Sequence, residues 1–467
     1  MCAEAVTPPL RVELRLQLAV LRAVSAWAPG GWAAPRHVYH AYTGCVVALL
    51  AALVAAQGMA ARHFWGDMLS VAMNACLIFT YIAAALKAVA FVTMRHFADT
   101  LVHDINRGLQ EFGECYRQEK EAVYAACARQ SVLLTCAHVG MGAVVHVCWL
   151  TLPATKAAAC QTVECRVKEG LPALVWFPFP FTEPPFYEAV YVGVSLALFY
   201  GYILTTMLDG FFFTLIIYTA GQLRVLNLMA TRLCDPEPGS KVCTDQQLQR
   251  RMAEAVQCHT HVDRCVQRLS TLLGPILLWQ FLSDILTISI TAFVATAAKT
   301  DAEWLFKYGS YLSAISEQLL LYCWLGHEIL SESERLQASA YSSDWTAAPR
   351  RLRGQLRVFL CRAHRPLRLT ASKFYTISRD TFLMVRVDER VFFVLRCAEA
   401  AEWRLMKQAS DLGRRHQQQT SHGALGGRII TLVYLLWLLE QNNTYCSPKT
   451  DQESVCNVND KLVLSFH

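Results

Sequence analysis

The sequence predicts an all-α membrane protein with six clear transmembrane helices, a disrupted seventh helix and a cytoplasmic N-terminus. Three observations lead to this fold class. Only 17% of the 467 residues are charged and 54% are hydrophobic, whereas soluble domains carry roughly 25% charged residues. The hydrophobic residues gather in runs of about 20, which is the length that crosses a bilayer. Basic residues are alternately abundant and scarce in the successive connections between these runs.

Residues 1–37 are expected to form a cytoplasmic N-terminal segment. Arg11, Glu13, Arg15 and Arg22 fit an amphipathic helix, and no compact hydrophobic core or cleavage site of a signal peptide is visible. We therefore expect the first spanning helix itself to direct insertion into the membrane.

The transmembrane region is expected over residues 38–326. Each hydrophobic run in it is long enough to cross ~30 Å of hydrocarbon at ~1.5 Å per residue. The six runs cover residues 38–58, 68–92, 131–152, 187–218, 275–297 and 304–325.

The connections between the runs set the orientation. The N-terminal segment and the connections after the second, fourth and sixth runs are rich in Lys and Arg, whereas the others hold few. Because basic residues favour the cytoplasmic side, the N-terminus is placed inside the cell. A G-protein-coupled receptor has the opposite orientation. The net charge of +6 is not gathered into one stripe, so a nucleic-acid partner is not expected.

Beyond the membrane, residues 97–130 and 224–273 combine helical periodicity with many charges. These segments are expected to extend spans 2 to 5 into a packed intracellular module. Residues 327–385 should form a further cytoplasmic segment and the start of helix 7. Residues 386–467 form an atypical tail, because Arg386, Asp388, Glu389, Arg390 and Arg396 interrupt the apolar residues. Each such charge costs ~2.5–3.5 kcal/mol at a bilayer centre.

Two close cysteine pairs lie in segments that we place outside the cell, Cys160 with Cys165 and Cys446 with Cys456. Disulfides persist in that environment, so both pairs are disulfide candidates. Most of the 18 cysteines lie in or beside apolar runs and are interpreted as small buried hydrophobic residues. Asn442 begins an Asn-Asn-Thr glycosylation sequon, which is usable only if the tail is outside.

Chemistry at a metal or catalytic centre is not predicted. Cys258, His259, His261 and Cys265 lie close in sequence, but no second Cys-x-x-Cys or His pair follows. We interpret them as ordinary residues of a cytoplasmic helix. The sequence also lacks a Gly-x-Ser-x-Gly, a P-loop, a His-Glu-x-x-His and a dinucleotide fingerprint. An enzyme, a metal and a cofactor are therefore not expected.

Residues 322–382 resemble the C-terminal hallmark of the insect odorant receptors. The matching features come in order over about 60 residues: Tyr322-Cys323, Gly326, Ser333, Tyr341, Trp345, Arg365-Pro366-Leu367, Leu369-Thr370-Ala371, Ser378 and Thr381-Phe382. Weaker matches extend the resemblance upstream to about residue 20: Trp27 with Pro29-Gly30, Leu171-Pro172 with the run from Trp176 to Phe181, Asp209, Gln222-Leu223 and Cys258-His259.

The resemblance implies a subunit of a ligand-gated cation channel in the plasma membrane of olfactory sensory neurons. In this family four subunits surround one pore, usually a tuning receptor together with the shared co-receptor in a heterotetramer. The last helix lines the pore, and the cytoplasmic ends of helices 4 to 7 form an anchor that joins the subunits. Small volatile ligands bind in the outer half of each subunit, among helices 2, 3, 4 and 6. This sequence departs from the family after Val385.

Candidate ligand-binding residues follow from the topology, since odd helices run outward and even helices run inward. An odorant pocket should be mostly apolar and aromatic with a few polar groups. The candidates in the outer halves of the helices are Met73, His146, Trp149, Tyr191, Ser195, Tyr308 and Tyr311. Packing between helices or an aromatic belt at the membrane interface would also account for each of them. His146 is the sharper candidate because ionisable residues inside spans are usually functional.

Three acidic residues lie in or near spans. Asp209 is expected to make a structural hydrogen bond near the cytoplasmic end of span 4. Asp284 and Glu317 are interpreted as facing the interior of the bundle, with no partner identified from the sequence.

Two alternative functions remain at this point. One is a gustatory receptor of the same superfamily, although its Thr-Tyr and Gln-Phe pattern in the last helix is not found here. The other is a non-conducting splice or gene-model variant, which the interrupted seventh helix favours. A transporter is a weaker option because no repeat of broken helices is visible.

Overall fold

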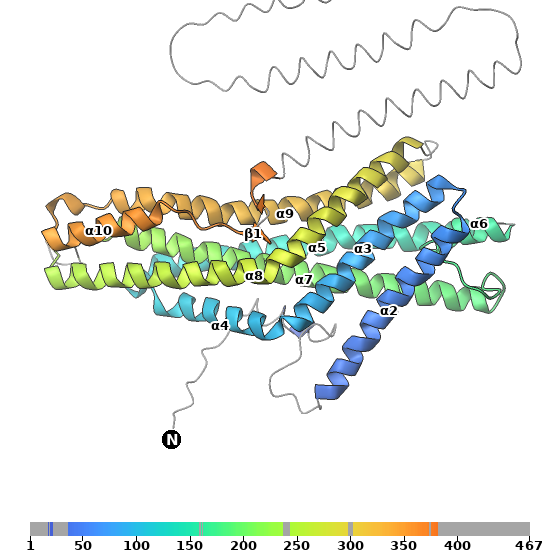
Figure 1. The fold of residues 1–467 in the computed structure, drawn as a ribbon, viewed down its shortest axis with the longest axis horizontal. Coiled ribbons are helices and arrows are strands. Elements are labelled where there is room, and N and C mark those ends of the chain that lie inside the picture. The colour runs from blue at the N-terminus through green and yellow to red at the C-terminus, as the bar shows by residue number, and fades with distance from the viewer. Residues whose placement is uncertain are drawn as a thin grey trace, which may run out of the picture. The chain divides into compact units, whose positions relative to one another are not determined.

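A computed structural model of the protein describes residues 17, 19–21, 36–157, 160, 162–236, 243–297, 302–372 and 375–381. Long helices that run side by side dominate these residues (Figure 1). In chain order the elements are α2 (Arg36–His63), α3 (Met68–Thr93), α4 (Arg95–Glu111), η1 (Glu114–Tyr116), α5 (Arg117–Ala157), α6 (Val163–Lys168), α7 (Phe186–Thr231), α8 (Asp245–Ala297), α9 (Ala302–Tyr341), η2 (Trp345–Ala347), α10 (Arg350–Ala363), β1 (Thr370–Ala371) and β2 (Tyr375–Thr376).

Helix α7 forms the centre of the bundle. It packs mainly against α5 and α9, and α3 packs mainly against α8. Phe211, Phe212 and Phe213 are all fully buried, although three consecutive residues cover nearly a full turn of a helix. A helix that is buried on every side must be surrounded by other helices.

Helix α5 has a side that carries exposed hydrophobic residues. Val132, Leu133, Val144 and Val147 are each about half exposed or more. Exposure of such a row of hydrophobic side chains to water is unfavourable and promotes aggregation, whereas lipid is a suitable solvent for it. The composition of this side of α5 therefore suits contact with lipid.

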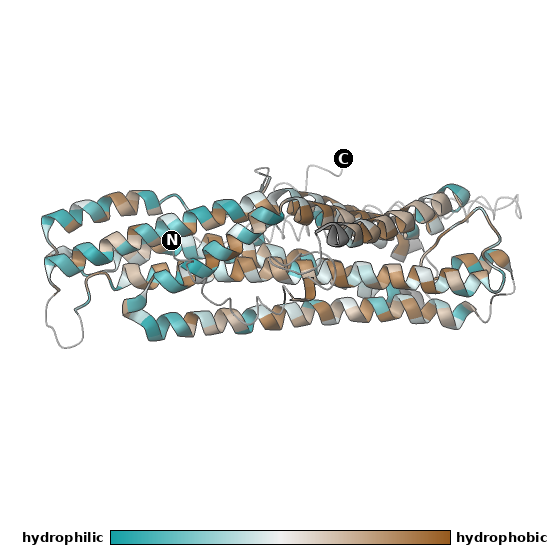
Figure 2. Ribbon diagram, turned by 90° about the horizontal axis from the view of Figure 1, so that it is seen from below, coloured by the Kyte–Doolittle hydropathy of each residue, from teal (hydrophilic) through white to brown (hydrophobic). Residues whose placement is uncertain are grey.

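Five helices of the described residues are long and apolar enough to cross a membrane: α2, α3, α5, α7 and α8. Hydrophilic residues concentrate at the end of the bundle that carries α10, and hydrophobic residues dominate its central part (Figure 2). The prediction of an all-α membrane protein is confirmed. The sixth predicted span falls in α9, which is not among those five, so the total number of spans stays a prediction.

The helical segments that the sequence places inside the cell differ in one respect from the prediction for residues 97–130. A break at residues 112–116 divides this segment between α4 and the start of α5. Gly113 lies in the break with φ of 76°, a left-handed conformation that suits glycine. Helices α7 and α8 do continue far beyond their apolar runs.

A short hairpin follows α10. Strand β1 pairs antiparallel with β2, with Thr370 opposite Thr376 and Ala371 opposite Tyr375. The chain is described only as far as Thr381, so the predicted helix 7 and the tail lie outside the described residues.

Candidate functional site

A largely apolar pocket lies between α3, α5, α7 and α9. It encloses about 140 Å³, and all four helices contribute to its wall. Leu77 and Tyr81 come from α3, Val145 from α5, Leu198 from α7 and Ile315 from α9. Pockets for small molecules are typically lined in this way, with a few polar groups among apolar ones. This space is called the main pocket below.

An aromatic cluster forms the outer part of the main pocket. The ring centroid of Trp149 lies 5.8 Å from that of Tyr308 and 5.7 Å from that of Tyr311, in edge-to-face arrangements. The hydroxyl of Tyr311 is 2.5 Å from Oγ1 of Thr80 and donates to the carbonyl of Cys76 at 3.1 Å. These bonds hold the Tyr311 ring against α3, so this wall is formed before any ligand arrives.

His146 lies in the same pocket. Its ring stacks on that of Tyr202, with centroids 5.3 Å apart, and its buried Nε2 has no hydrogen-bond partner among the described residues. The hydroxyl of Tyr202 donates to the carbonyl of Val139 at 2.7 Å and holds the pair in place. Nε2 of His146 is therefore available to a polar group of a ligand.

Two candidate residues on α7 lie outside the pocket walls. The hydroxyl of Tyr191 donates to the carbonyl of Leu150 at 2.7 Å, which ties α7 to α5. Ser195 has a buried Oγ with no hydrogen-bond partner among the described residues. Neither residue lines the main pocket or the outer pocket described below.

Asp209 of α7 is the centre of a buried polar network at the inner end of the main pocket. Its fully buried carboxylate accepts hydrogen bonds from Nζ of Lys87 at 2.7 and 3.0 Å and from the Tyr322 hydroxyl at 2.5 Å. The amide of Gln318 donates to the same carboxylate. A buried charge is costly unless it is paired and hydrogen-bonded, and here both conditions are met.

His138 brings α5 into this network. Its Nδ1 lies 2.8 Å from the carboxylate of Glu317, and its Nε2 lies 3.6 Å from that of Asp209. His138, Glu317 and Gln318 also line the main pocket, so the network forms the polar floor of an otherwise apolar space. The structure thus supplies the partner of Glu317 that the sequence did not reveal. Asp284 accepts a hydrogen bond from Gln280 at 2.6 Å.

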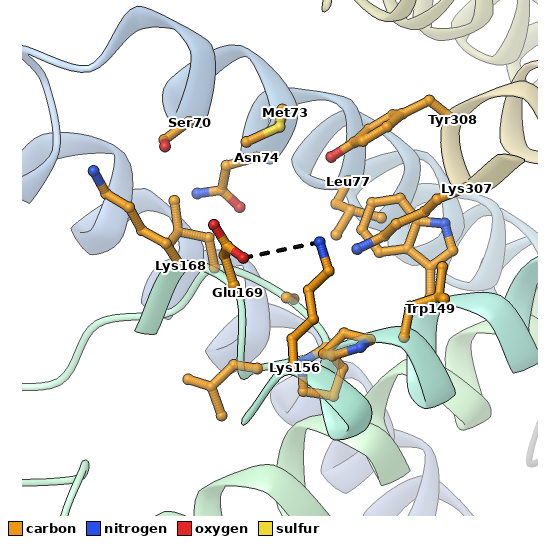
Figure 3. Close-up of a pocket in the computed structure, with 16 residues that line it drawn as sticks. Ser70, Met73, Asn74, Leu77, Trp149, Lys156, Lys168, Glu169, Lys307 and Tyr308 are labelled. Atoms are coloured by element: carbon orange, nitrogen blue, oxygen red, sulfur yellow. Dashed lines mark ion pairs between the residues drawn. The ribbon is translucent and has the colours of Figure 1, made fainter. Parts of the chain in front are cut away.

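A smaller outer pocket of about 60 Å³ shares Leu77 and Trp149 with the main pocket (Figure 3). Two further candidates, Met73 and Tyr308, line it. Three lysines also line this space, Lys156, Lys168 and Lys307, and they come from three different segments of the chain. The outer pocket is therefore more polar than the main pocket and more basic.

The connections at the end of the bundle that carries α6 are held by covalent and ionic links (Figure 1). Cys160 and Cys165 form a disulfide. Lys168 contacts the carboxylate of Asp67 at 2.7 Å, and Asp67 caps the N-terminus of α3 by accepting from the amide of Ser70. Burial disfavours the charged form of Asp67, but hydrogen bonds from Lys168 and Ser70 outweigh it and lower the pKa to about 2.

The Cys258–Cys265 segment forms part of α8, where Sγ of Cys265 lies 3.6 Å from Nε2 of His261. That nitrogen is also 3.0 Å from the carbonyl oxygen of Asp104. Within the described ranges, no group of three or more metal-ligating side chains comes together.

Residues 67–386 match the sequence model of the 7tm odorant receptor family. The chain belongs to this family. Among the similar relatives of this odorant receptor-family protein, odorant receptor 82a of Drosophila melanogaster is 21% identical over 322 residues, which cover 68% of this chain and 81% of that receptor.

Other relatives match over shorter regions. Odorant receptor 92a of Drosophila melanogaster is 26% identical over 39% of this chain and 44% of its own length. The odorant receptor coreceptor of Anopheles gambiae is 25% identical over 28% of this chain and 27% of its own length. The match to this chain therefore covers less than half the length of each of these two relatives.

The fold of this odorant receptor-family protein is that of a solved insect olfactory receptor. The structure of OR5 from Machilis hrabei in complex with eugenol superposes with a TM-score of 0.72 at 16% identity. The match covers 83% of this chain and 98% of that one.

Several residues of the site were missed from the sequence. Lys87 and His138 are ionisable residues inside predicted spans, so the argument that pointed to His146 applied equally to them. Tyr81 and Tyr202 were also missed, since aromatic residues are too common in these spans to stand out. Asn442, Cys446 and Cys456 lie outside the described residues.

Proposed function

We propose that this protein is a tuning subunit of an odorant-gated cation channel, with a small volatile molecule bound in the main pocket. The observation that carries the proposal is the main pocket itself, with its apolar wall, its polar floor and the available Nε2 of His146. Such a pocket suits a molecule with a hydrophobic body and one polar group.

Channel gating in this proposal follows from differential binding. A ligand favours the open state only by the difference between its affinities for the open and closed states. The main pocket contacts α3, α5, α7 and α9 at once, so a change in their packing would alter its shape. Its polar floor also includes Gln318, whose amide donates a hydrogen bond to Asp209. A ligand that contacts Gln318 would therefore be linked to the hydrogen-bond network that joins the helices.

Assembly is proposed to follow the family. A heterotetramer with the co-receptor would place residues 38–326 in the plasma membrane of an olfactory neuron, with residues 1–37 in the cytoplasm. Residues 327–385 would form the anchor and the start of helix 7. The match to the co-receptor is restricted to 28% of this chain, whereas the match to odorant receptor 82a covers 68% of it, and this difference supports the role of a tuning subunit.

The test is co-expression with the co-receptor in cells that lack other odorant receptors. Currents are recorded while a panel of volatile compounds is applied. The Ala314→Phe variant places a large ring in the main pocket, which Ala314 lines, and Ala314→Ser is its matched control. We expect odorant-evoked current in the wild type and the serine variant, and a loss of at least tenfold in sensitivity in the phenylalanine variant.

A protein that reaches the cell surface with the co-receptor and gives no current would contradict the channel function. That result would favour the second candidate, a non-conducting variant, which the charges between Arg386 and Arg396 suggest. Current that Ala314→Phe leaves unchanged would instead show that the ligand binds elsewhere.

A further inference from the structure

Lys307 is a cation in the outer pocket with no carboxylate within 4.0 Å among the described residues. Its Nζ lies 4.0 Å from the ring centroid of Trp149, over the face of the indole. A cation–π contact of this kind offsets only part of the cost of taking an ammonium group out of water. Among the side chains that the structure describes, Lys307 therefore lacks the anionic partner that a partly buried lysine normally has.

The other two lysines of the outer pocket do have such partners. Lys168 contacts Asp67 at 2.7 Å and Glu164 at 2.8 Å, and Lys156 lies 3.8 Å from Glu169. Figure 3 shows Lys156 and Lys307 extending toward the same space, with the Lys156–Glu169 contact on the opposite side. Glu169 is the single carboxylate among the described residues that line the pocket, and it contacts Lys156, so Lys307 has no carboxylate contact among them.

A second donor without an acceptor lines the same space. The indole Nε1 of Trp149 is buried and has no hydrogen-bond partner among the described residues. An indole nitrogen can only donate a hydrogen bond, and an ammonium group can only donate as well. Trp149 and Lys307 thus both offer donors to whatever occupies the outer pocket.

The rest of the wall suits a hydrocarbon chain. Met73, Leu77, Leu152 and Leu174 line the outer pocket, and Leu77 also lines the main pocket. A ligand that satisfies both parts of the site has an anionic acceptor group at one end and an aliphatic body.

We propose that the outer pocket binds the carboxylate of a small aliphatic acid, with the Lys307 ammonium group as its counterion. This inference rests on the proposed function and names the class of ligand. Ammonium–carboxylate hydrogen bonds are charge-assisted and about twice as strong as neutral ones. The carboxylate also gives the Lys307 ammonium group a counterion. A neutral ester cannot do so, and we therefore expect it to bind less tightly than the acid.

The experiment compares octanoate with methyl heptanoate, a neutral ester that has the same number of carbon atoms and is an isomer of octanoic acid. Full-length protein in lipid nanodiscs is titrated with each radiolabelled compound at neutral pH, and binding to empty nanodiscs is subtracted. The wild type should bind octanoate at least tenfold more tightly than the ester.

Three variants locate the effect. Lys307→Met should weaken octanoate binding at least tenfold and change ester binding less than threefold, whereas Lys307→Arg should keep the preference for the acid. Arg62→Gln removes one exposed positive charge from the same side of the membrane, outside the pocket, and should change neither value. Size-exclusion profiles check that each variant folds.

Equal binding of octanoate and methyl heptanoate to the wild type would overturn the proposal, and so would an equal effect of Lys307→Met on the binding of both. Either result leaves odorant-evoked current intact if the proposed function is correct. Absence of current from every neutral and acidic compound, by contrast, would count against the proposed function itself.

Discussion

Asp209 has a carboxylate with no exposure to solvent and with donors on α3 and α9. Lys87 supplies the compensating charge at 2.7 Å, and both side chains are almost completely buried. Ion pairs of this kind stabilise a fold little compared with a well-packed apolar pair. Loss of one partner, however, strongly destabilises the fold because the other charge stays buried without compensation. We therefore expect the network to make the packing of these helices specific.

Removal of one charge from this pair should destabilise the protein much more than removal of both. Asp209→Asn leaves Lys87 buried without a counterion and should lower the free energy of unfolding by ~3–5 kcal/mol. The double variant Lys87→Met with Asp209→Asn keeps an acceptor for the Tyr322 hydroxyl and should recover a large part of that loss. Unfolding temperatures of purified protein in detergent measure the effect. Additive effects of the two substitutions would contradict a direct interaction.

The Asp67–Lys168 pair predicts a pH dependence on the outer side. The folded pKa of Asp67 is about 2, below the ordinary 3.8, so its contribution is present above pH 3.8 and disappears as the pH falls toward 2. Asp67→Asn keeps a capping side chain but removes the charge. The difference in unfolding temperature between wild type and variant should be constant above pH 4 and shrink toward pH 2.

That difference should be small, because 38% of the Asp67 side chain is exposed. Exposed ion pairs contribute no more than about 1 kcal/mol, and salt screens them. A difference that stays constant from pH 5 to pH 2 would show that the charge of Asp67 does not matter.

For each candidate residue of the site, the sequence predicted how far along its helix the residue lies, but not which way its side chain faces. Met73, His146, Trp149, Tyr308 and Tyr311 line one of the two pockets, because distance from the helix end follows from topology. Rotation about the axis of α7 could not be predicted. Since α7 is apolar on all sides, its sequence does not show which side faces the pocket, and Tyr191 and Ser195 lie elsewhere.

At the scale of elements, α9 meets the segment after β2 at very close range. A Cβ added to Gly326 would lie 2.8 Å from both Cγ2 and the carbonyl oxygen of Ile377. A side chain at this position would push the segment of residues 375–381 away from α9. The glycine is thus needed for close packing of the helix.

Two alanine substitutions in α9 should have opposite effects. Gly326→Ala should lower the free energy of unfolding by ~1–3 kcal/mol through overpacking. Gly309 has no atom within 4 Å of its added Cβ, so Gly309→Ala should be neutral or stabilise the helix by up to ~1 kcal/mol. Heating followed by size-exclusion chromatography compares the two variants. Equal stability of both would show that the contact with Ile377 is adaptable.

Hydropathy predicted the helices correctly where spanning the membrane requires a long run of apolar residues. The runs at residues 38–58 and 68–92 fall inside α2 and α3, because length and apolar composition are direct consequences of spanning lipid. Outside the membrane no such constraint applies. The break at Gly113 and the pairing of β1 with β2 depend on tertiary contacts as well as on local sequence, and the sequence did not reveal them.

For the whole molecule, the predicted orientation places η1 in the cytoplasm and the end of α2 outside the cell. Cys115 of η1 is exposed in the subunit. A membrane-impermeant maleimide should label Cys115 only after permeabilisation, with Cys115→Ser as the control that assigns the signal. A cysteine placed at the exposed position of Arg62 should be labelled in intact cells. Labelling of Cys115 in intact cells would reverse the topology.

The pairing of Lys87 with Asp209 also constrains biosynthesis. The two residues are 122 positions apart, and ribosomes add ~5–20 residues per second, so the lysine waits about 6–24 s for its partner. During that interval α3 carries a bare charge that the lipid interior disfavours. We therefore expect the nascent chain to be held at the translocon, or shielded by a chaperone, until α7 emerges. Truncated products that end before α7 should be prime targets for degradation.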